Sequence, residues 1–190
     1  MSRYVETDAV LLEYKNRGEM DRVLTLYTRD LGRVDAYGKS IRAGSSKLKG
    51  HGVLFANSRV MLVSAGGLWR LVDMETIRFP HDAPSNAVFL GECARFLLRL
   101  VTHEESNEKL WDVICTLPYM KGREGASFFK ARVLWAQGLL PDEARLSLFF
   151  TPHATQFLSG ETGGEFLADD EETRKFNSGI ERILLENHVV

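Results

Sequence analysis

A change in hydrophobic period near residue 80 divides this chain. In residues 7–79, apolar side chains recur at every second position within short runs, which is typical of half-buried strands. Pro80 and Pro84 interrupt this pattern, and beyond them apolar residues recur at the three- and four-residue spacing of amphipathic helices. The sequence therefore predicts an α+β chain, with a β-domain at residues 1–80 and a helical domain at residues 81–190.

The first half contains five predicted strands separated by Gly-, Asn- and Asp-rich turns. These strands cover residues 8–14, 21–28, 33–37, 53–64 and 68–78. The third and fourth are joined by one long connection, and the other turns are short. Five strands with one long loop favour an oligonucleotide-binding (OB) barrel, a β-barrel that closes its own edges.

The second half is predicted to form an antiparallel helical bundle. Helices are expected from Ser85, from Asn107, from about Gly125 to Gly138, and from Glu171 to about His188. At about residues 141–168 a cysteine-free insertion interrupts the bundle. Phe157-Leu158 and Phe166-Leu167 flank a Gly-rich turn there, so this insertion is predicted to be either a small hairpin or irregular.

The net charge of −2 conceals an uneven distribution. Residues 1–80 hold 13 Lys and Arg against 9 Asp and Glu, whereas the remainder holds 11 against 17. The excess positive charge is concentrated between Arg33 and Arg59, where Asp35 is the only acidic residue among six basic ones. A local positive field of this kind favours contact with a polyanion at the β-domain.

Gly38–Gly52 is the centre of this basic segment. Its lysines and arginine lie on a Gly- and Ser-rich backbone, which suits contact with a phosphate backbone. The alternative is a solvated loop with no role beyond solubility. We predict phosphate contacts from Arg33, Lys39, Arg42, Lys47, Lys49 and Arg59. Tyr37 and Trp69 are candidates for stacking on bases, or else for the barrel core.

Motifs of catalysis and of metal binding are not found in the sequence. Gly38-Lys39-Ser40 lacks the earlier glycine of a Walker A loop, and there is no HExxH motif or nucleophile elbow. Cys93 and Cys115 are too few for a zinc ribbon. Asp169–Glu172 is an acidic run that suits a helix N-terminus better than a cation site. We therefore expect no enzymatic activity, no cofactor, and folding without metal.

Targeting signals are also not evident. The N-terminal residues lack a basic start followed by an apolar core, and the apolar runs are too short to span a bilayer. We expect a cytoplasmic protein, associated with the nucleoid if it binds DNA.

Residues 8–71 carry an ordered set of motifs that resembles the bacterial RecO family of recombination mediators. The motifs are Glu19-Met20-Asp21-Arg22, Thr28-Arg29-Asp30-Leu31-Gly32-Arg33, Gly38-Lys39 with Arg42, and Leu48-Lys49-Gly50. The helical half resembles the family more loosely, through Leu90–Leu100 and Phe129–Gly138. Family members commonly carry zinc-binding cysteines after the third helix, whereas this chain has no cysteine beyond Cys115, so it resembles a short form without them.

The resemblance implies a non-enzymatic DNA-binding protein of recombinational repair. Such a protein binds single- and double-stranded DNA, anneals complementary strands and, with RecR, helps to load RecA. It also implies that the helical domain binds the acidic, apolar C-terminal tail of the single-stranded-DNA-binding protein. Candidate residues for that tail are Lys121, Arg123, Lys130 and Arg132 for charge, and Leu97, Leu134 and Trp135 for an apolar notch.

One departure bears on the tail site. Where the family often has arginines before the Phe of the third helix, this chain has Ser127-Phe128. From the residues alone, two alternatives to a DNA-binding mediator remain. One is an RNA-binding or translation-associated OB protein, and the other is a protein-interaction module that binds no nucleic acid.

Overall fold

The computed structural model describes residues 3–44, 46–48, 50–80, 83–102, 104–119, 122–141, 146–158 and 170–189. The chain forms two compact units. The first comprises Met1–Ala83 together with Val101–Tyr119, and the second comprises Pro84–Leu100 together with Met120–Val190. The predicted division at residues 80 and 81 had placed residues 101–119 with the helices. We describe each unit by itself.

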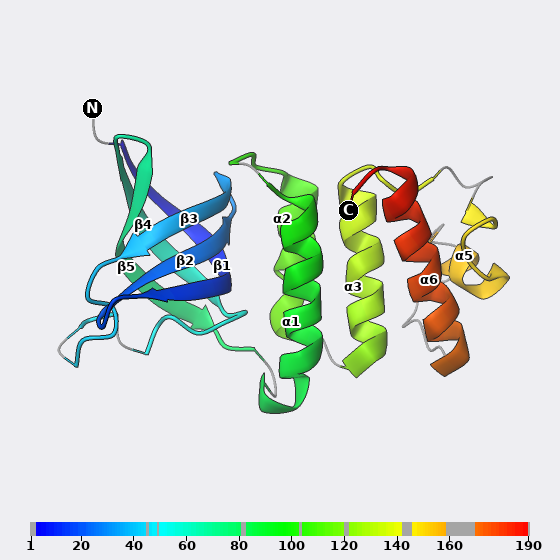
Figure 1. Cartoon of the computed structure of the whole chain (residues 1–190), viewed down its shortest axis with the longest axis horizontal. Coiled ribbons are helices and arrows are strands. Elements are labelled where there is room, and N and C mark those ends of the chain that lie inside the picture. Colours follow the sequence, from blue (N-terminus) through cyan, green and yellow to red (C-terminus); the bar gives the residue numbers. More distant parts are fainter. Residues whose placement is uncertain are drawn as a thin grey trace. The chain divides into compact units, whose positions relative to one another are not determined.

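Five strands of the first unit form a closed barrel (Figure 1). They are β1 (Arg3–Arg17), β2 (Asp21–Thr28), β3 (Gly32–Gly38), β4 (Asn57–Ala65) and β5 (Leu68–Arg78). Their order around the barrel is β1-β2-β3-β5-β4, with β3 and β5 parallel and the other neighbours antiparallel. The predicted five-stranded OB-type barrel is confirmed.

The length of β1 allows the barrel to close. Its first half pairs with β4 from Arg3 to Val10, and its second half pairs with β2 from Ala9 to Arg17. The register shifts between Leu11 and Glu13, and a β-bulge of this kind bends a strand and increases its twist. One strand can therefore serve two partners, and no long edge of the sheet is left open at β1.

Inward-facing residues of the strands form the barrel core. Ala9, Leu24, Leu26, Leu62 and Met74 are almost completely buried, at alternate positions along their strands. The loop between β3 and β4 also contributes to this core, because Ile41 and Leu48 are only 4% and 9% exposed. The loop conformation is thus tied to the barrel by apolar packing.

Residues 101–119 cover one side of the barrel within the first unit. They contain α2 (Glu108–Ile114), capped by the Asn107 side chain, and a short 3-10 helix, Leu117–Tyr119. Trp111 of α2 stacks on Tyr27 of β2 with 6.5 Å between ring centroids. The guanidinium of Arg33 donates to the Val101 carbonyl at 2.9 Å. These contacts explain why the segment belongs to the compact unit of the barrel.

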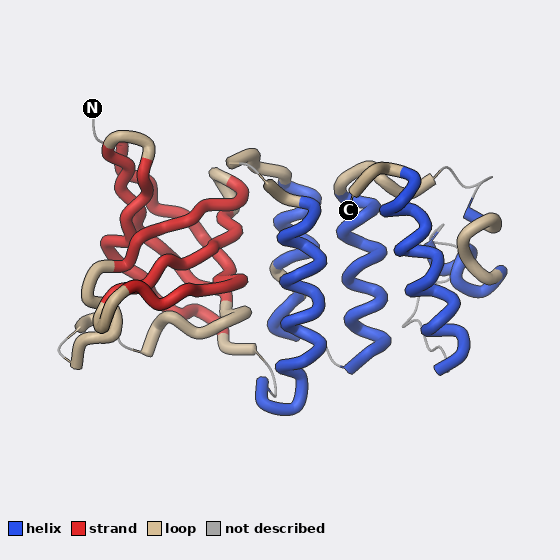
Figure 2. Tube along the Cα trace, in the orientation of Figure 1, coloured by secondary structure: helices blue, strands red, loops and turns tan. Residues whose placement is uncertain are grey.

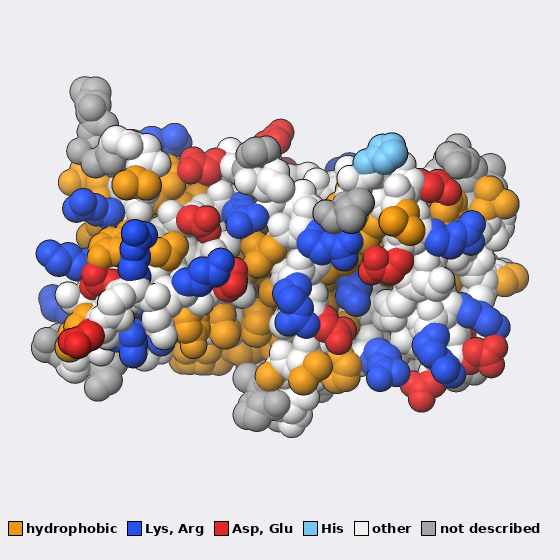
Figure 3. All heavy atoms as spheres, viewed as in Figure 1, with side chains coloured by type: hydrophobic (Ala, Val, Ile, Leu, Met, Phe, Trp, Pro, Cys, Tyr) orange, Lys and Arg blue, Asp and Glu red, His pale blue; other side chains and the backbone are white. Residues whose placement is uncertain are grey.

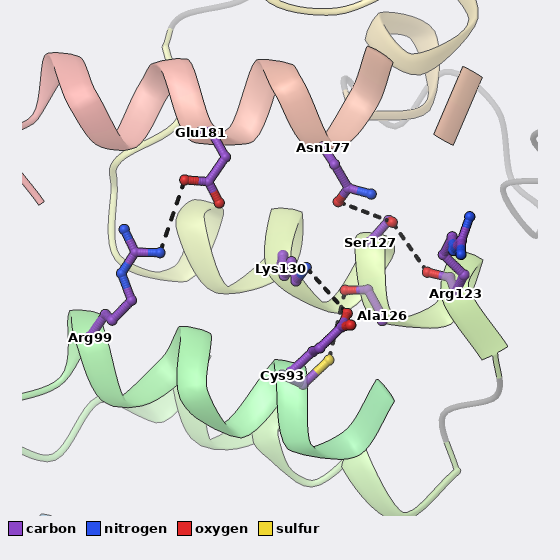
Figure 4. A network of polar contacts seen from close by, with 9 residues as sticks. Cys93, Arg99, Arg123, Ala126, Ser127, Lys130, Asn177 and Glu181 are labelled. Carbon is purple, nitrogen blue, oxygen red and sulfur yellow. Dashed lines mark hydrogen bonds and ion pairs between the residues drawn. The ribbon is translucent and has the colours of Figure 1, made fainter. Parts of the chain in front are cut away.

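The second unit is helical (Figure 2). Its helices are α1 (Ala83–Leu100), α3 (Gly122–Ala136), α5 (Pro152–Leu158) and α6 (Asp170–Glu186). Polar contacts join α1, α3 and α6 around their apolar core (Figure 4): Lys130 to Glu92, Ser127 to Asn177, and Arg99 to Glu181. The predicted helical character of this half is confirmed.

One prediction for this unit is wrong in part. Phe157 and Leu158 lie in helix α5 and not in a strand of a small hairpin. Pro152 occupies the first position of that helix, where a missing N–H costs no hydrogen bond. Phe166-Leu167, the other half of the predicted hairpin, lies outside the described residues. Within the described parts of the chain, no helix combines the length and hydropathy needed to cross a bilayer.

Candidate nucleic-acid interface

The loop after β3 folds back onto the β1–β2 turn at one end of the barrel. The Arg42 N–H donates to the Met20 carbonyl at 3.0 Å, and its guanidinium lies 3.5 Å from the Gly18 carbonyl oxygen. The Ser40 N–H donates to Oδ1 of Asp21 at 2.6 Å. We call the turn at residues 18–20 and the loop residues 38–44 and 46–48 the basic end of the barrel.

Apolar and basic residues alternate in direction along this loop. Ile41 and Leu48 point into the core, whereas Lys39, Arg42 and Lys47 are exposed. Burying two aliphatic side chains fixes the backbone that carries the three cations, so they do not have to be ordered by a ligand. The described part of the loop is therefore a preorganised cationic surface. Figure 3 shows Lys and Arg side chains spread over the barrel, with acidic ones interspersed.

Asp21 is an acidic residue within the basic end. Its carboxylate accepts hydrogen bonds from the Tyr37 hydroxyl and from the Ser40 N–H. The bond from Tyr37, followed by that from Ser40, lowers the pKa of Asp21 below its usual value. The same bond raises the pKa of the Tyr37 phenol. Asp21 thus positions the loop and the Tyr37 ring, and its negative charge is partly neutralised by the two donors.

Two further cations near Tyr37 were not predicted. Arg17 and Arg70 are both exposed and close enough for their charges to lower the pKa of the Tyr37 phenol against the larger effect of Asp21. Arg70 is the register partner of Tyr37 across the parallel β3–β5 pair. The alternation along β5 predicts that Arg70 faces outward, but no sequence pattern reveals the parallel pairing.

The other predicted DNA-binding residues are dispersed. Arg33 is held by the Val101 carbonyl, and Arg59 forms an ion pair with Asp8 at 3.1 Å. Glu6 and Glu75 also lie close to Arg59 and raise its pKa, after the larger effect of Asp8. Both arginines are therefore weaker candidates than Lys39, Arg42 and Lys47. Lys49 lies outside the described residues.

Trp69 is part of the barrel core. It is 5% exposed, and its indole N–H donates to Oε1 of Glu104 at 2.8 Å. Of the two roles considered for Trp69, the structure favours the core over base stacking. A pocket of about 350 Å³ lies beside it, and its lining includes Arg33, Asp35 and Glu104. Two carboxylates in this lining make the pocket unsuitable for phosphate.

The predicted tail-binding residues that the structure describes belong to the second unit, and their environments differ. Leu97 and Leu134 are completely buried, so neither lines a surface notch. Lys130 pairs with Glu92 at 3.8 Å, and Arg123 pairs with Asp170 at 3.6 Å. By contrast, Arg132 lies over the Phe128 ring at 5.5 Å, and Trp135 is 53% exposed. Lys121 lies outside the described residues.

The cysteines and the acidic run do not form a metal site within the described residues. Burial raises the pKa of Cys93 to about 12 and that of Cys115 to about 11, so both are protonated at neutral pH. Asp170, Glu171 and Glu172 occupy the first turn of α6 and contact Arg123, Lys175 and Thr151 respectively. The part of this run that the structure describes therefore serves the helix N-terminus.

The closed five-stranded topology and the basic loop between its third and fourth strands define the class of the first unit as an OB-type barrel protein. The family model "Recombination protein O N terminal" matches residues 1–80. The first 80 residues are therefore similar to the N-terminal part of the RecO family.

Curated proteins of the same family are similar to this chain over longer stretches. A DNA repair protein RecO of Dehalococcoides mccartyi is 27% identical over 183 residues, which cover 89% of this chain and 71% of that protein. RecO of Acaryochloris marina is 30% identical over 60% of this chain and 40% of its own length. RecO of another D. mccartyi strain is 36% identical over 57% of this chain and 44% of its own length. In the latter two cases the chain thus covers less than half of its relative.

Proposed function

We propose that this chain is a DNA-binding recombination mediator that acts in recombinational repair at the nucleoid. In this proposal it binds single- and double-stranded DNA, anneals complementary strands and helps RecR to load RecA, without catalysing a covalent reaction. The observation that carries the proposal is the anchored loop, which presents Lys39, Arg42 and Lys47 at the end of an OB-type barrel. The curated relatives named DNA repair protein RecO support it.

The chemistry of the basic end suits a ligand recognised by charge. Lysine and arginine contacts with phosphates are independent of base identity and position the strand without reading its sequence. A mediator must act wherever damage occurs, so contact through phosphates matches the proposed task. The neighbouring carboxylate, Asp21, already accepts two hydrogen bonds within the protein, which limits its repulsion of DNA.

A salt titration with a matched control tests this site. Each phosphate contact contributes a slope of about −0.7 for single strands or −0.9 for duplex in log K against log salt. The double variant Lys39→Ala/Arg42→Ala should therefore bind single strands more weakly at low salt, with a slope about 1.4 units shallower. Arg59→Ala removes a cation that is paired with Asp8 and should change the slope little.

Three outcomes would contradict the site or the ligand. Equal slopes for wild type and the double variant would remove the basic end from the interface. A larger change of the salt slope in Arg59→Ala than in the double variant would show that the DNA interface lies on the β1–β4 face instead. Tighter binding of RNA than of DNA of the same sequence would favour the RNA-binding alternative, because only contacts with the 2′-hydroxyl distinguish the two.

For the second unit, we propose that α3 binds the acidic, apolar tail of the single-stranded-DNA-binding protein. Phe128, Arg132 and Trp135 are spaced four and three residues apart and therefore share one helix face. A guanidinium over an aromatic ring offers both a bidentate partner for a carboxylate and an apolar wall. Lys130 and Arg123 are weaker candidates because each already pairs with a carboxylate.

Calorimetric titration with a short acidic peptide ending in Phe tests the tail contact. We expect the wild type to bind at low salt and Arg132→Ala to bind more weakly. Arg174→Ala, which removes an exposed arginine from α6, is the matched control. Equal binding by wild type and Arg132→Ala would exclude Arg132, and no binding by wild type would exclude the tail as a ligand.

A further inference from the structure

One row of side chains crosses four strands on the outer surface of the barrel. Tyr4 of β1 is the register partner of Val63 of β4, which pairs with Arg70 of β5, which in turn pairs with Tyr37 of β3. Their chain neighbours, including Leu62, Trp69, Leu71 and Ala36, point into the core. Since side chains alternate along a strand, the four residues of the row face outward.

This row differs in charge from the two parallel rows that follow it along the barrel. The next row consists of Glu6, Met61 and Asp73, and the one after it consists of Asp8, Arg59 and Glu75. Each of these two rows carries two carboxylates, whereas the Tyr4–Tyr37 row carries an arginine and no carboxylate. A polyanion on this face is therefore favoured along the first row and repelled from the others.

The aromatic members of the row are placed to contact bases. Tyr4 is 71% exposed, an unusual state for a large aromatic side chain on a barrel strand. The Tyr37 ring is half-buried and held by its hydroxyl bond to Asp21, so its orientation is set before a ligand arrives. Strands lie about 4.8 Å apart, so Arg70 is about one strand spacing from Tyr37 and two from Tyr4.

We propose that this row binds single-stranded DNA, with bases stacked on the rings of Tyr4 and Tyr37 and with the Arg70 guanidinium in contact with the strand between them. We call these four residues the track. Tyrosine rings and guanidinium planes stack on any base, and a cationic groove with such platforms is a recurrent way to bind single strands. Bases in a duplex are already stacked on each other, so the rings give an advantage to single strands. The inference rests on the proposed DNA-binding function and adds to it a strand preference and two residues, Tyr4 and Arg70.

The test compares three fluorescent ligands of equal length on the full chain: oligo-dT, an abasic single strand and a duplex. Loss of one stacking platform should weaken binding of oligo-dT by about 5- to 150-fold. We expect this loss for Tyr4→Ala on oligo-dT, with little change on the abasic strand or the duplex. Tyr4→Phe keeps the ring and should bind oligo-dT like the wild type.

Tyr119→Ala is the matched control. Tyr119 is also an exposed tyrosine of the first unit, at 50%, but it lies beside Arg78, eight positions from Arg70 along β5. This variant should bind all three ligands like the wild type. Arg70→Ala should weaken binding to both single strands, because its charge acts on phosphates as well as on bases.

The outcomes separate this inference from the proposed function. If Lys39→Ala/Arg42→Ala weakens DNA binding but Tyr4→Ala binds oligo-dT like the wild type, the track is wrong and the DNA-binding function stands. If Tyr4→Ala weakens all three ligands equally, Tyr4 does not act through base stacking, and the track is also wrong. If the wild type binds none of the three ligands at low salt, the proposed function fails together with the track.

Discussion

Asp21 shows how a single acidic residue can support a cationic surface. A bare carboxylate beside Lys39 would weaken the attraction of a phosphate, yet this one accepts hydrogen bonds from the Tyr37 hydroxyl and the Ser40 backbone. Ser40 has a φ of 51°, a conformation that residues other than glycine rarely adopt. The bond from its N–H to Asp21 stabilises that conformation and thereby the direction in which the loop leaves β3.

Replacement of Asp21 by Asn should loosen the loop and lower the pKa of the Tyr37 phenol. The folded-state pKa of Asp21 is lowered, so its contribution to stability is present above the ordinary pKa of aspartate and is lost as pH falls through the lowered pKa. The pKa of Tyr37 is raised mainly by the hydrogen bond to Asp21. The Tyr37 phenol therefore contributes to stability below the ordinary tyrosine pKa, and this contribution is lost as the pH rises through the raised pKa.

NMR titration of the Tyr37 ring and hydrogen exchange of the Ser40 amide measure both effects. Asp35→Asn is the control, since Asp35 is an exposed carboxylate on β3 that accepts a bond from the Thr25 hydroxyl. An unchanged Tyr37 titration in Asp21→Asn would show that the carboxylate does not hold the ring in solution.

At the scale of elements, the connection between α2 and the barrel depends on a glycine. Gly32 opens β3 with a φ of 69°, and a Cβ atom at this position would collide with the backbone of Glu105. The segment before α2 can therefore approach the barrel closely only because residue 32 has no side chain. The same segment provides Val101 and Glu104, which bind Arg33 and Trp69.

Gly32→Ala should destabilise the protein by about 1–3 kcal/mol more than Gly18→Ala. Both glycines have positive φ, so both variants incur a backbone strain of about 1–2 kcal/mol. Gly18 has open space around it, whereas Gly32 faces the Glu105 backbone, and the difference isolates the steric contact. Urea unfolding measures both variants, and equal destabilisation would show that the segment before α2 does not lie against Gly32.

The basic loop is the second element whose behaviour depends on buried contacts. Ile41→Ala should cost about 2–5 kcal/mol of stability, because it leaves a cavity in the barrel core. It should also weaken DNA binding without removing any charge, since Lys39 and Arg42 lose a fixed backbone. Chemical denaturation and DNA titration test the two effects. If stability falls while DNA affinity stays unchanged at a temperature where the variant is folded, the loop does not need its anchor to bind.

At the scale of the molecule, the two compact units do not coincide with the two halves of the sequence. Residues 101–119 follow the first long helix in the chain, but they belong with the barrel. Their apolar residues Leu110, Trp111, Val113 and Ile114 are buried, and Trp111 lies against a barrel tyrosine. The compact unit of the barrel thus includes a segment that lies outside residues 1–80, which the family model matches.

Truncation of Trp111 should destabilise the barrel unit more than the helical unit. Trp→Ala changes in cores typically cost about 3–5 kcal/mol, and this loss should increase amide exchange in β2 and β3. Phe176→Ala, which empties a buried position of α6, should instead increase exchange in the second unit. Hydrogen exchange by mass spectrometry resolves the two patterns. If Trp111→Ala exchanges faster in α3 and α6 but not in the barrel strands, residues 101–119 belong with the helical unit and the prediction is wrong.

The sequence by itself determined the elements and their chemistry. Period-2 runs with short turns defined the five strands, a change of period after Pro80 defined the helical half, and the local excess of Lys and Arg located the basic loop. These features are local, because backbone geometry links the spacing of side chains to one face of a strand or helix. The predicted hairpin strand at Phe157-Leu158 is wrong because two apolar residues are too short a pattern to distinguish a strand from a helix.

Only the tertiary structure decided which of these residues act together. Arg59 is in the basic segment of the sequence, yet strand register pairs it with Asp8, which lies 51 positions away. Tyr4, Arg70 and Tyr37 are distant in sequence and only Tyr37 is a candidate from the sequence, but the register of four strands brings them into one row. Register and barrel closure depend on the packing of the whole core, so no pattern within a single segment can specify them.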